Sequence, residues 1–346
     1  MVVMSSAVRD TDRPDYTDVP GGDADRPSQI PRRGWFQIAK RGWAEAKADQ
    51  VPLLAAGLAY YAFLAIFPAI IAAVSLYGLF ADPTQIVGQL SQVLQGIPAE
   101  ARDLIIDQLR NQSSRRVGLG IGAVVSIVIA LWSASGGVGQ LLTAVNVAYD
   151  EEEKRSFVAK RGLALLVTLG AIVFMVIVFG LVAVLPAVLA RLDLGPLSWL
   201  LQIVRWVLIA AVVSVALAVI YRIGPDRDAP KIRWLSVGAA LATVLWLIAS
   251  IGFAIYVASF GSYAKTYGAV AGIVVMLFWL WITSYAILLG AEVNAEAEQQ
   301  TVRDSTRGPA RPLGERGAVK ADSVPDEDSD DGAPSDSRTT AGRRDG

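Results

Sequence analysis

Residues 51–81 read VPLLAAGLAYYAFLAIFPAIIAAVSLYGLFA and contain no charged side chain. A helix needs about 20 apolar residues to cross a hydrocarbon layer of roughly 30 Å, so this stretch is long enough to span a membrane. Soluble helices keep a polar stripe, and this stretch has none. Because it contains Pro68, we expect either a tilted span kinked at the proline or a span followed by an interfacial turn.

Five more apolar segments follow, separated by short charged connections. With the first they predict six spans, at 51–81, 117–148, 163–190, 195–221, 234–260 and 267–292. The composition agrees, because 53% of the 346 residues are hydrophobic and only 18% are charged, whereas a soluble domain carries about 25% charge. The sequence therefore predicts an all-α integral membrane protein built as a bundle of six transmembrane helices.

The two ends of the chain differ from this membrane domain. Residues 1–31 and 298–346 are rich in Asp, Arg, Pro and Gly and poor in apolar side chains. Such segments bury too little apolar surface to offset the entropy lost on ordering, so both tails are expected to be disordered. The folded domain is therefore expected to cover 32–297. The first residues lack the apolar core of a signal peptide, so the first span is expected to direct membrane insertion.

Two further helical elements are expected at the membrane surfaces. Residues 32–49 place apolar and basic side chains at helical spacing, which predicts an N-terminal amphipathic helix in the headgroup layer or, alternatively, a docking site for a partner. Residues 82–116 begin with the helix-start pair Asp82-Pro83 and are interrupted by Gly96 and Pro98. This pattern predicts a helical hairpin that lies over the outer face of the bundle.

The basic residues predict the orientation in the membrane. Thirteen of them lie near membrane ends on one side, within 32–47, 154–161 and 222–233, and six lie on the opposite side. The side with the excess faces the cytoplasm under the positive-inside rule, so both termini are expected there. An even number of spans agrees with this placement.

The composition excludes several kinds of chemistry. The chain contains neither Cys nor His, which removes thiolate nucleophiles, disulfides, the commonest transition-metal ligand and the usual general base near neutral pH. We therefore expect no metal, no other cofactor and no enzymatic activity. The acidic run Asp150–Glu153 borders Lys154 and Arg155 and is interpreted as a solvated helix end. The net charge of −1 gives no basic excess to attract nucleic acid.

Polar groups inside or at the ends of apolar helices are costly, so they are the candidate functional residues. Glu292 ends the sixth span and is interpreted as a coupling carboxylate or, alternatively, as an ordinary helix-end group. Arg205 lies inside the fourth span and is expected to pair with a carboxylate, to snorkel, or to contact a lipid phosphate. The candidates for a substrate path or for coupling are Arg205, Glu292, Asn146, Asp49 and Tyr60. For Asn146 and Tyr60, the alternative interpretation is a role in helix packing. For Asp49, the alternative is an ion pair with basic residues of an inner loop.

Five short motifs resemble, in the same order, those of the YihY/BrkB family of bacterial inner-membrane proteins. They are Leu58–Pro68, Val145-Asn-Val-Ala-Tyr149, Tyr221-Arg-Ile-Gly-Pro225, Tyr267-Gly268 and Gly290-Ala-Glu-Val-Asn294. The resemblance covers residues 35–297. It departs from the family at Ala65-Ile-Phe-Pro68, where members usually have Ser-Leu-Phe-Pro, so no role for that hydroxyl is carried over.

The resemblance implies a six-helix protein of the bacterial cytoplasmic membrane. Members of the family have been named ribonuclease BN and virulence or serum-resistance factors, and a transport role has been proposed for them. A metal-dependent phosphodiesterase needs clusters of metal ligands, usually rich in His, that hold and activate a water. This chain has no His, so we do not expect ribonuclease activity.

Two functional hypotheses follow. The first is a transporter or lipid-handling translocator, favoured by the Pro and Gly interruptions of the spans and by Arg205, Asn146 and Glu292. The second is a non-transporting membrane scaffold or envelope-integrity factor, favoured by small-residue packing surfaces. Membrane lipids are the expected partners, and the sequence leaves open whether the chain forms a homo-oligomer. If the three polar residues line one cavity, transport is favoured; local pairing of each favours the scaffold.

Overall fold

The computed structural model describes residues 19–77, 121–184, 198–259 and 261–325, and within these ranges the chain is helical without β-strands. The long helices are α1 (Arg32–Ala48), α2 (Val51–Tyr77), α5 (Ile121–Ala148), α6 (Phe157–Phe179), α8 (Ser198–Ile223), α9 (Ile232–Ser259) and α10 (Gly261–Gln299). A short 3-10 turn, η2 (Pro27–Gln29), precedes α1, and a π-helical turn, η4 (Gly180–Val184), extends α6. This architecture confirms the predicted all-α class.

Five of the described helices are long and apolar enough to cross a membrane. These candidate spans are Val128–Ala148, Phe157–Val182, Trp199–Ile223, Ile232–Val257 and Val270–Gln299. A sixth candidate is the pair formed by α1 and the first part of α2, as far as Ile66, whose axes meet at 65°. The chain is therefore a multi-pass membrane protein with five to six candidate spans. The hairpin expected at 82–116 lies outside the described residues.

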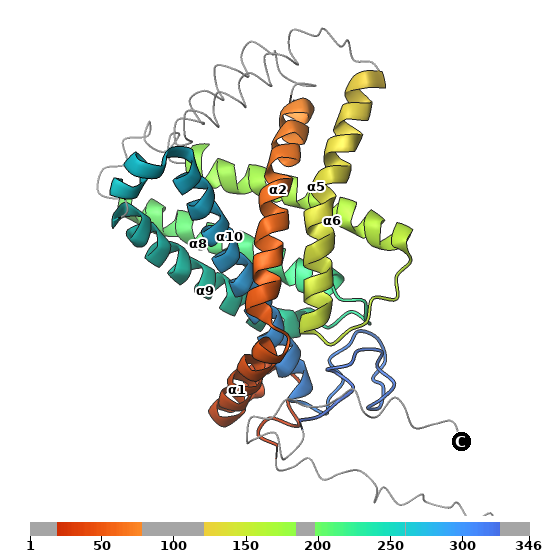
Figure 1. Cartoon of the computed structure of the whole chain (residues 1–346). Helices are drawn as coiled ribbons and strands as arrows, with labels where there is room; N and C mark the ends of the chain where they lie inside the picture. The colour runs from red at the N-terminus through yellow and green to blue at the C-terminus, as the bar shows by residue number, and fades with distance from the viewer. Residues whose placement is uncertain (1–18, 78–120, 185–197, 260, 326–346) are drawn as a thin grey trace, which may run out of the picture.

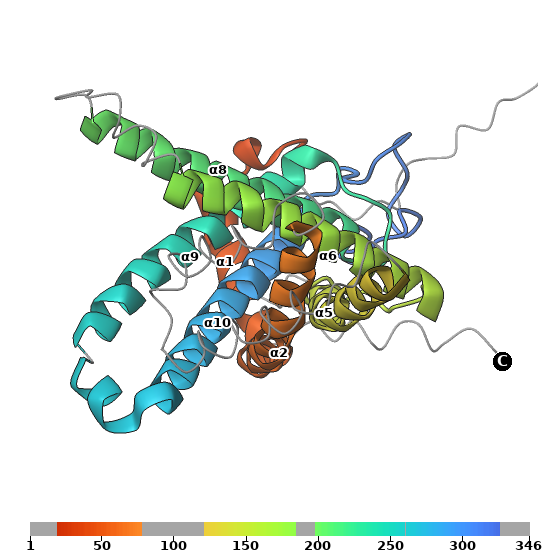
Figure 2. The same ribbon diagram turned by 90° about the horizontal axis from the view of Figure 1, so that it is seen from above.

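The helices are arranged around α10. Figure 1 shows α2 and α5 side by side, with α6 and α8 crossing them obliquely, and α9 and α10 pack against each other along much of their length. The view from above in Figure 2 shows α10 between α9 and α2. The basal end of the bundle is defined here as the place where α1, the connections 149–156 and 224–231, the end of α10 and residues 300–325 meet.

Glycine contacts bring α9 and α10 together. A Cβ atom on Gly290 would lie 2.7 Å from the carbonyl oxygen of Gly238, and one on Gly238 would collide with the carbonyl of Gly290. This close approach lets polar groups reach across the interface. The Gly238 N–H donates to Asn294 Oδ1 at 2.9 Å, and the Tyr221 hydroxyl of α8 donates to the Ile287 carbonyl at 2.7 Å. The three helices α8, α9 and α10 are therefore joined near the basal end.

The last span continues beyond the boundary expected from hydropathy. The sequence predicted its end at residue 292, whereas α10 continues to Gln299. Residues 290–300 are all buried, so every face of this end of the helix is covered by other parts of the protein. Hydropathy could not show this, because the residues are polar and their cover comes from elements distant in sequence.

The predicted amphipathic helix is present as α1, and its small residues face α10. Gly34, Ile38, Gly42 and Ala46 are buried along one stripe. At Gly42, the position of a Cβ atom lies 3.4 Å from a methyl group of Val293. The aromatic rings of Phe36 and Trp43 are instead exposed. The helix therefore packs on protein through its small residues, and a location of its aromatic face in the headgroup layer stays a prediction.

The described parts of the two tails fold onto the basal end, which differs from the expected disorder. Residues 300–325 are called the basal cap from here on. The Val302 N–H donates to the Gly22 carbonyl at 2.8 Å, which joins the cap to the N-terminal segment. The Lys231 N–H donates to the Ser305 carbonyl at 2.8 Å, which joins it to the connection between α8 and α9. The folded region therefore extends at both ends beyond 32–297, to include 19–31 and 298–325.

Polar side chains hold the basal cap in shape. The Arg316 guanidinium donates to the carbonyl oxygens of Ala321, at 2.6 Å, and of Val302. The Asp322 carboxylate accepts the backbone N–H groups of Gly314 and Arg316, each at 2.9 Å. Internal hydrogen bonds of this kind satisfy turns that contain few apolar residues. Composition alone therefore gave no sign that this segment is ordered.

Candidate functional site

The end of α10 carries four polar residues at alternate positions: Glu292, Asn294, Glu296 and Glu298. Successive residues of an α-helix are about 100° apart, so alternate residues point to nearly opposite sides. Glu292 and Glu296 consequently share one face, and Asn294 and Glu298 share the other. All four are almost completely buried, and each face meets a different set of partners.

On the first face, Glu296 is held by two cations. Arg41 Nε of α1 donates to it at 2.7 Å, and Lys320 Nζ of the basal cap donates at 2.8 Å. Lys320 also forms ion pairs with Asp150 at 3.0 Å and with Glu45 at 3.4 Å. Burial tends to lower the pKa of Lys320, but these three carboxylates raise it above its usual value. Lys320 therefore stays charged and ties the cap to α1, α10 and the end of α5.

On the second face, Glu298 forms a buried two-pronged ion pair with Arg227. The guanidinium nitrogens donate to the two carboxylate oxygens at 2.7 and 3.0 Å, and the Ser305 hydroxyl donates at 2.9 Å. The side chains of Arg227 and Glu298 are 1% and 0% exposed. Arg227 also lies over the ring of Tyr149, 4.3 Å from its centroid, and the Tyr149 hydroxyl accepts from Asn294 Nδ2 at 3.0 Å. Both carboxylate oxygens of Glu298 are therefore paired, and among the described side chains of this face only Nε of Arg227 lacks a hydrogen-bond partner.

Asn146 is satisfied locally at the basal end. Its Nδ2 donates to Glu153 at 3.1 Å, and its Oδ1 accepts the Asp226 N–H at 2.8 Å. Arg155 bridges the same two acids through Nε, at 3.0 Å from Glu153 and 3.2 Å from Asp226. Asn146 therefore fastens the end of α5 to both neighbouring connections, which corresponds to its packing interpretation.

Glu292 differs from the other acids of α10. Its side chain is 1% exposed, and its Oε1 atom has no hydrogen-bond partner. The charged groups that act on it most strongly are Asp49, Lys320, Glu296 and Glu45. A buried carboxyl oxygen without a partner is energetically costly. Within the described ranges, the acidic residues form no group of three that could hold a metal ion.

Glu151 links the basal cap to the end of α5. Its carboxylate accepts the Val319 N–H at 2.8 Å. Burial raises its pKa to about 7, although the Val319 N–H and the charge of Arg227 act in the opposite direction. An acid whose pKa is higher in the folded protein than in the unfolded chain stabilises the fold when protonated. The contribution of this contact should therefore decline as the pH rises through about 7.

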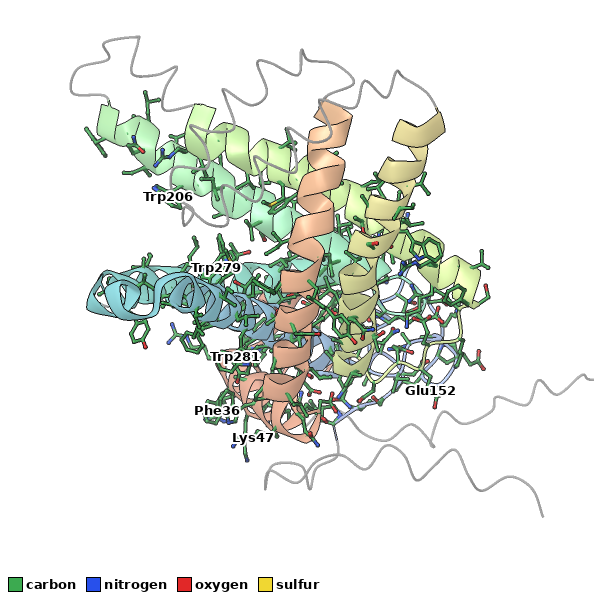
Figure 3. The ribbon with its side chains drawn as sticks, turned by 45° about the horizontal axis from the view of Figure 1, so that its top comes forward. Phe36, Lys47, Glu152, Trp206, Trp279 and Trp281 are labelled. Atoms are coloured by element: carbon green, nitrogen blue, oxygen red, sulfur yellow. The ribbon has the colours of Figure 1, made fainter. Side chains whose placement is uncertain are left out.

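Arg205 and Tyr60 lie away from the basal cluster. Arg205 is eighteen residues before the end of α8, about 27 Å along the helix at 1.5 Å per residue. Its guanidinium lies 5.5 Å from the ring centroid of Trp206, which Figure 3 shows far from Lys47 of α1. Tyr60 is 55% exposed on α2, with its ring edge-on to Tyr61. The predicted residues therefore do not share one site: Glu292 and Asp49 lie close together, and Asn146 lies elsewhere in the basal end.

Sequence reasoning missed most of the partners in this cluster. Two of them, Glu296 and Glu298, follow Glu292 and Asn294 at a spacing of four, with alanines between the acids. Residues four apart lie on the same face of a helix, so this repeat indicates two faces that are both packed against protein. The cations Arg41 and Arg227 were assigned only to membrane orientation. Lys320 lies in a segment whose composition is typical of disorder, so no local signal marks it.

The comparisons with known proteins identify the family. A sequence profile named virulence factor BrkB matches residues 43–313, more than half of the chain. The chain belongs to the virulence factor BrkB family. This confirms the resemblance found in the sequence motifs.

The relatives of this BrkB-family chain include proteins from several bacteria. The ribonuclease-like protein YfkH of Bacillus subtilis strain 168 is 33% identical over 248 residues, covering 69% of this chain and 87% of YfkH. The UPF0761 membrane protein NTHI0384 of Haemophilus influenzae strain 86-028NP is 22% identical, covering 74% of this chain and 93% of its own. The UPF0761 membrane protein PBPRA3489 of Photobacterium profundum is 26% identical, covering 72% of this chain and 77% of its own. No solved structure gives a significant match.

Replacing Lys320 with methionine should lower the thermal stability of the purified protein. The change removes one cation from a buried group of carboxylates, and breaking such a pair costs about 3 kcal/mol or more. The matched control is Arg311→Ala, because Arg311 and Asp228 form an ion pair with side chains 42% and 48% exposed, worth at most about 1 kcal/mol. Thermal unfolding in detergent measures both variants. Equal midpoints for the two would contradict the role given to Lys320.

Glu151→Gln should flatten the pH dependence of stability. In the wild type, the unfolded chain loses this proton near pH 4.5 and the folded protein near pH 7, so the unfolding midpoint should fall as the pH rises from about 4.5 to 7 and level off above that. The variant keeps an acceptor for the Val319 N–H but cannot ionise. Exposed Glu152 supplies the control Glu152→Gln, which should retain the wild-type slope. The same slope in all three proteins would remove Glu151 as the cause.

Proposed function

We propose that this BrkB-family protein is a transporter or lipid-handling translocator of the cytoplasmic membrane, and not an enzyme. One observation carries the proposal: Glu292 is buried at the end of the last candidate span, with one carboxyl oxygen unpaired, while Glu296 and Glu298 beside it are fully paired. An ionisable group that is buried at the end of a span without compensation is costly, and such a group is a candidate for a role in transport or proton movement.

A second feature supports lipids as the material that is handled. The part of α8 around Arg205 exposes large apolar side chains, among them Trp199, Ile203 and Trp206. Arg205 Nε has no hydrogen-bond partner in the described part of the chain. Nε itself is buried, but a guanidinium offers several further donors and a fixed positive charge, which suit it to a lipid phosphate. Arg205 would then receive headgroups at the end of the bundle opposite to Glu292.

The ribonuclease-like name of YfkH gives no comparable support for hydrolysis by this chain. Phosphodiester cleavage needs an activated water and groups that stabilise the developing charge. The cations of the basal cluster, Arg41, Arg227 and Lys320, are already engaged by buried carboxylates. The basal cluster therefore offers no pair of free groups suited to that reaction.

The alternative is a non-transporting membrane scaffold or envelope-integrity factor. The observation that favours it is the local pairing of Asn146 and the separation of Arg205 from Glu292, since the two residues share no single site. Under this alternative, the basal ion pairs serve only to hold the helices and the cap in place. The two proposals differ in the consequence of changing Glu292, which a scaffold would tolerate.

We also propose that the basal end faces the cytoplasm, in agreement with the excess of basic residues. The chain lacks cysteine, so single cysteines report position without background. Glu152→Cys should react with a membrane-impermeant maleimide only in inverted vesicles, and Ser113→Cys, in the loop expected on the other side, only in right-side-out vesicles. The reverse pattern would overturn the orientation. Equal labelling of both sites by a permeant maleimide is the control.

Translocation can be measured with purified protein in liposomes that contain headgroup-labelled lipids. The wild type should move label between leaflets, Glu292→Gln should reduce the rate to that of protein-free liposomes, and Arg205→Ala should weaken it. Glu315→Gln is the control, because Glu315 is an exposed acid of the basal cap. Unchanged translocation in Glu292→Gln at wild-type expression and thermal stability would exclude Glu292. No wild-type translocation of any labelled lipid would favour the scaffold.

A further inference from the structure

The environment of Glu292 has an excess of negative charge. The titratable groups that act on it come from four elements: Glu45 and Asp49 from the end of α1, Tyr149 from the end of α5, Glu296 from α10 and Lys320 from the basal cap. With Glu292 itself, four carboxyl groups gather here. The nearby cations are Lys320 and Arg41, and Lys320 also serves Asp150. Carboxyl groups therefore outnumber cations by two to one.

The hydrogen bonds of these cations go to residues other than Glu292. Arg41 donates to Glu296 and to Gln300, and Lys320 donates to Glu296 and Glu45. Oε1 of Glu292 is left without a partner at 1% exposure. A full negative charge on such an atom would be neither solvated nor paired, which is strongly unfavourable in a protein interior. Neighbouring carboxyl groups at such a site cannot all ionise at low cost.

We propose that Glu292 carries a proton in the resting protein, and that this proton is the coupling ion of the translocation cycle. Proton binding follows from the geometry of the basal end, whereas its coupling to movement of a substrate rests on the proposed function. A proton on Glu292 removes one negative charge from the cluster. The proton-binding behaviour belongs to the group as a whole, with Asp49 as the strongest charged neighbour.

The junction of α1 and α2 supplies a way to release the proton. Asp49 caps α1, and Gln50 then takes a left-handed conformation with φ of 53°, after which α2 starts at 65° to α1. α1 rests on α10 through small residues such as Gly42, which has no side chain to interlock the two helices. A shift that moves Asp49 and admits water would let the O–H bond of Glu292 break. The proton would pass to water, and the electron pair would stay on the carboxylate.

Infrared spectroscopy of the full chain in phosphatidylethanolamine–phosphatidylglycerol liposomes tests proton binding directly. Glu151 is also partly protonated near neutral pH, because its pKa is about 7, so all proteins in this test carry Glu151→Gln. In this background at neutral pH, the protein with Glu292 intact should show the carbonyl band of a protonated carboxylic acid. The band should be absent in Glu292→Gln and present in Glu292→Asp, which keeps a carboxyl group, and in the control Glu315→Gln. Asp49→Asn removes one neighbouring negative charge, which makes the proton on Glu292 easier to lose. As the pH is raised, the band should therefore disappear at a lower pH in this variant than in the protein with Asp49.

Three results would overturn the proton site: no such band in the protein with Glu292 intact, an unchanged band in Glu292→Gln, or loss of the band on adding Na⁺ at constant pH. The outcome is independent of the lipid assay. A band assigned to Glu292 in a protein that moves no labelled lipid leaves the proton site standing and counts against lipid translocation. Coupling is tested by a pH gradient, which should accelerate wild-type translocation and leave Glu292→Gln at the rate of protein-free liposomes. Equal wild-type rates with and without the gradient would contradict coupling.

Discussion

The helix α10 imposes the constraint on which the rest of the structure depends. Its 39 residues make it about 58 Å long at 1.5 Å per residue, whereas a hydrocarbon layer is roughly 30 Å thick. A helix of this length carries its polar end, from Glu292 to Gln299, beyond a simple span. Those residues are buried, so other elements must supply their partners. The helix α1, both described connections and the basal cap are placed where they do so.

The two faces of that helix end have different consequences. The Glu298 face is closed by Arg227, Ser305 and the ring of Tyr149, and it works as a fixed junction between the end of α5, the connection from α8 to α9, and the cap. The Glu292 face is held through Glu296 but leaves Glu292 itself under-compensated. A rigid junction beside an uncompensated acid is a suitable arrangement for a group whose protonation changes during a cycle. Stability and the proposed function therefore depend on neighbouring residues of one helix.

The sequence was sufficient for the membrane part of the fold. Unbroken apolar runs predicted the spans, and the motifs predicted the family, because both signals are local. Glu292 and Asp49 were each predicted as candidates, but their proximity was not, because the partners considered for Asp49 were basic residues of an inner loop. The cap could not be predicted: Lys320 and Arg316 act through partners in other elements and in the backbone, and their segment has the composition of a disordered tail. The separation of Arg205 from Glu292 likewise depends on tertiary packing.

Hydrogen–deuterium exchange of the purified protein tests the central claim, that an ordered basal cap encloses the polar end of α10. Slow exchange is expected for amides in 292–299 and for cap amides with described acceptors, such as those of Val302 and Val319. In Lys320→Met, exchange should rise in the cap and in 292–299 together, while α9 keeps its protection. Complete exchange of residues 300–325 within seconds in the wild type would contradict the account, since a freely fluctuating segment could neither bury Lys320 nor shield Glu292.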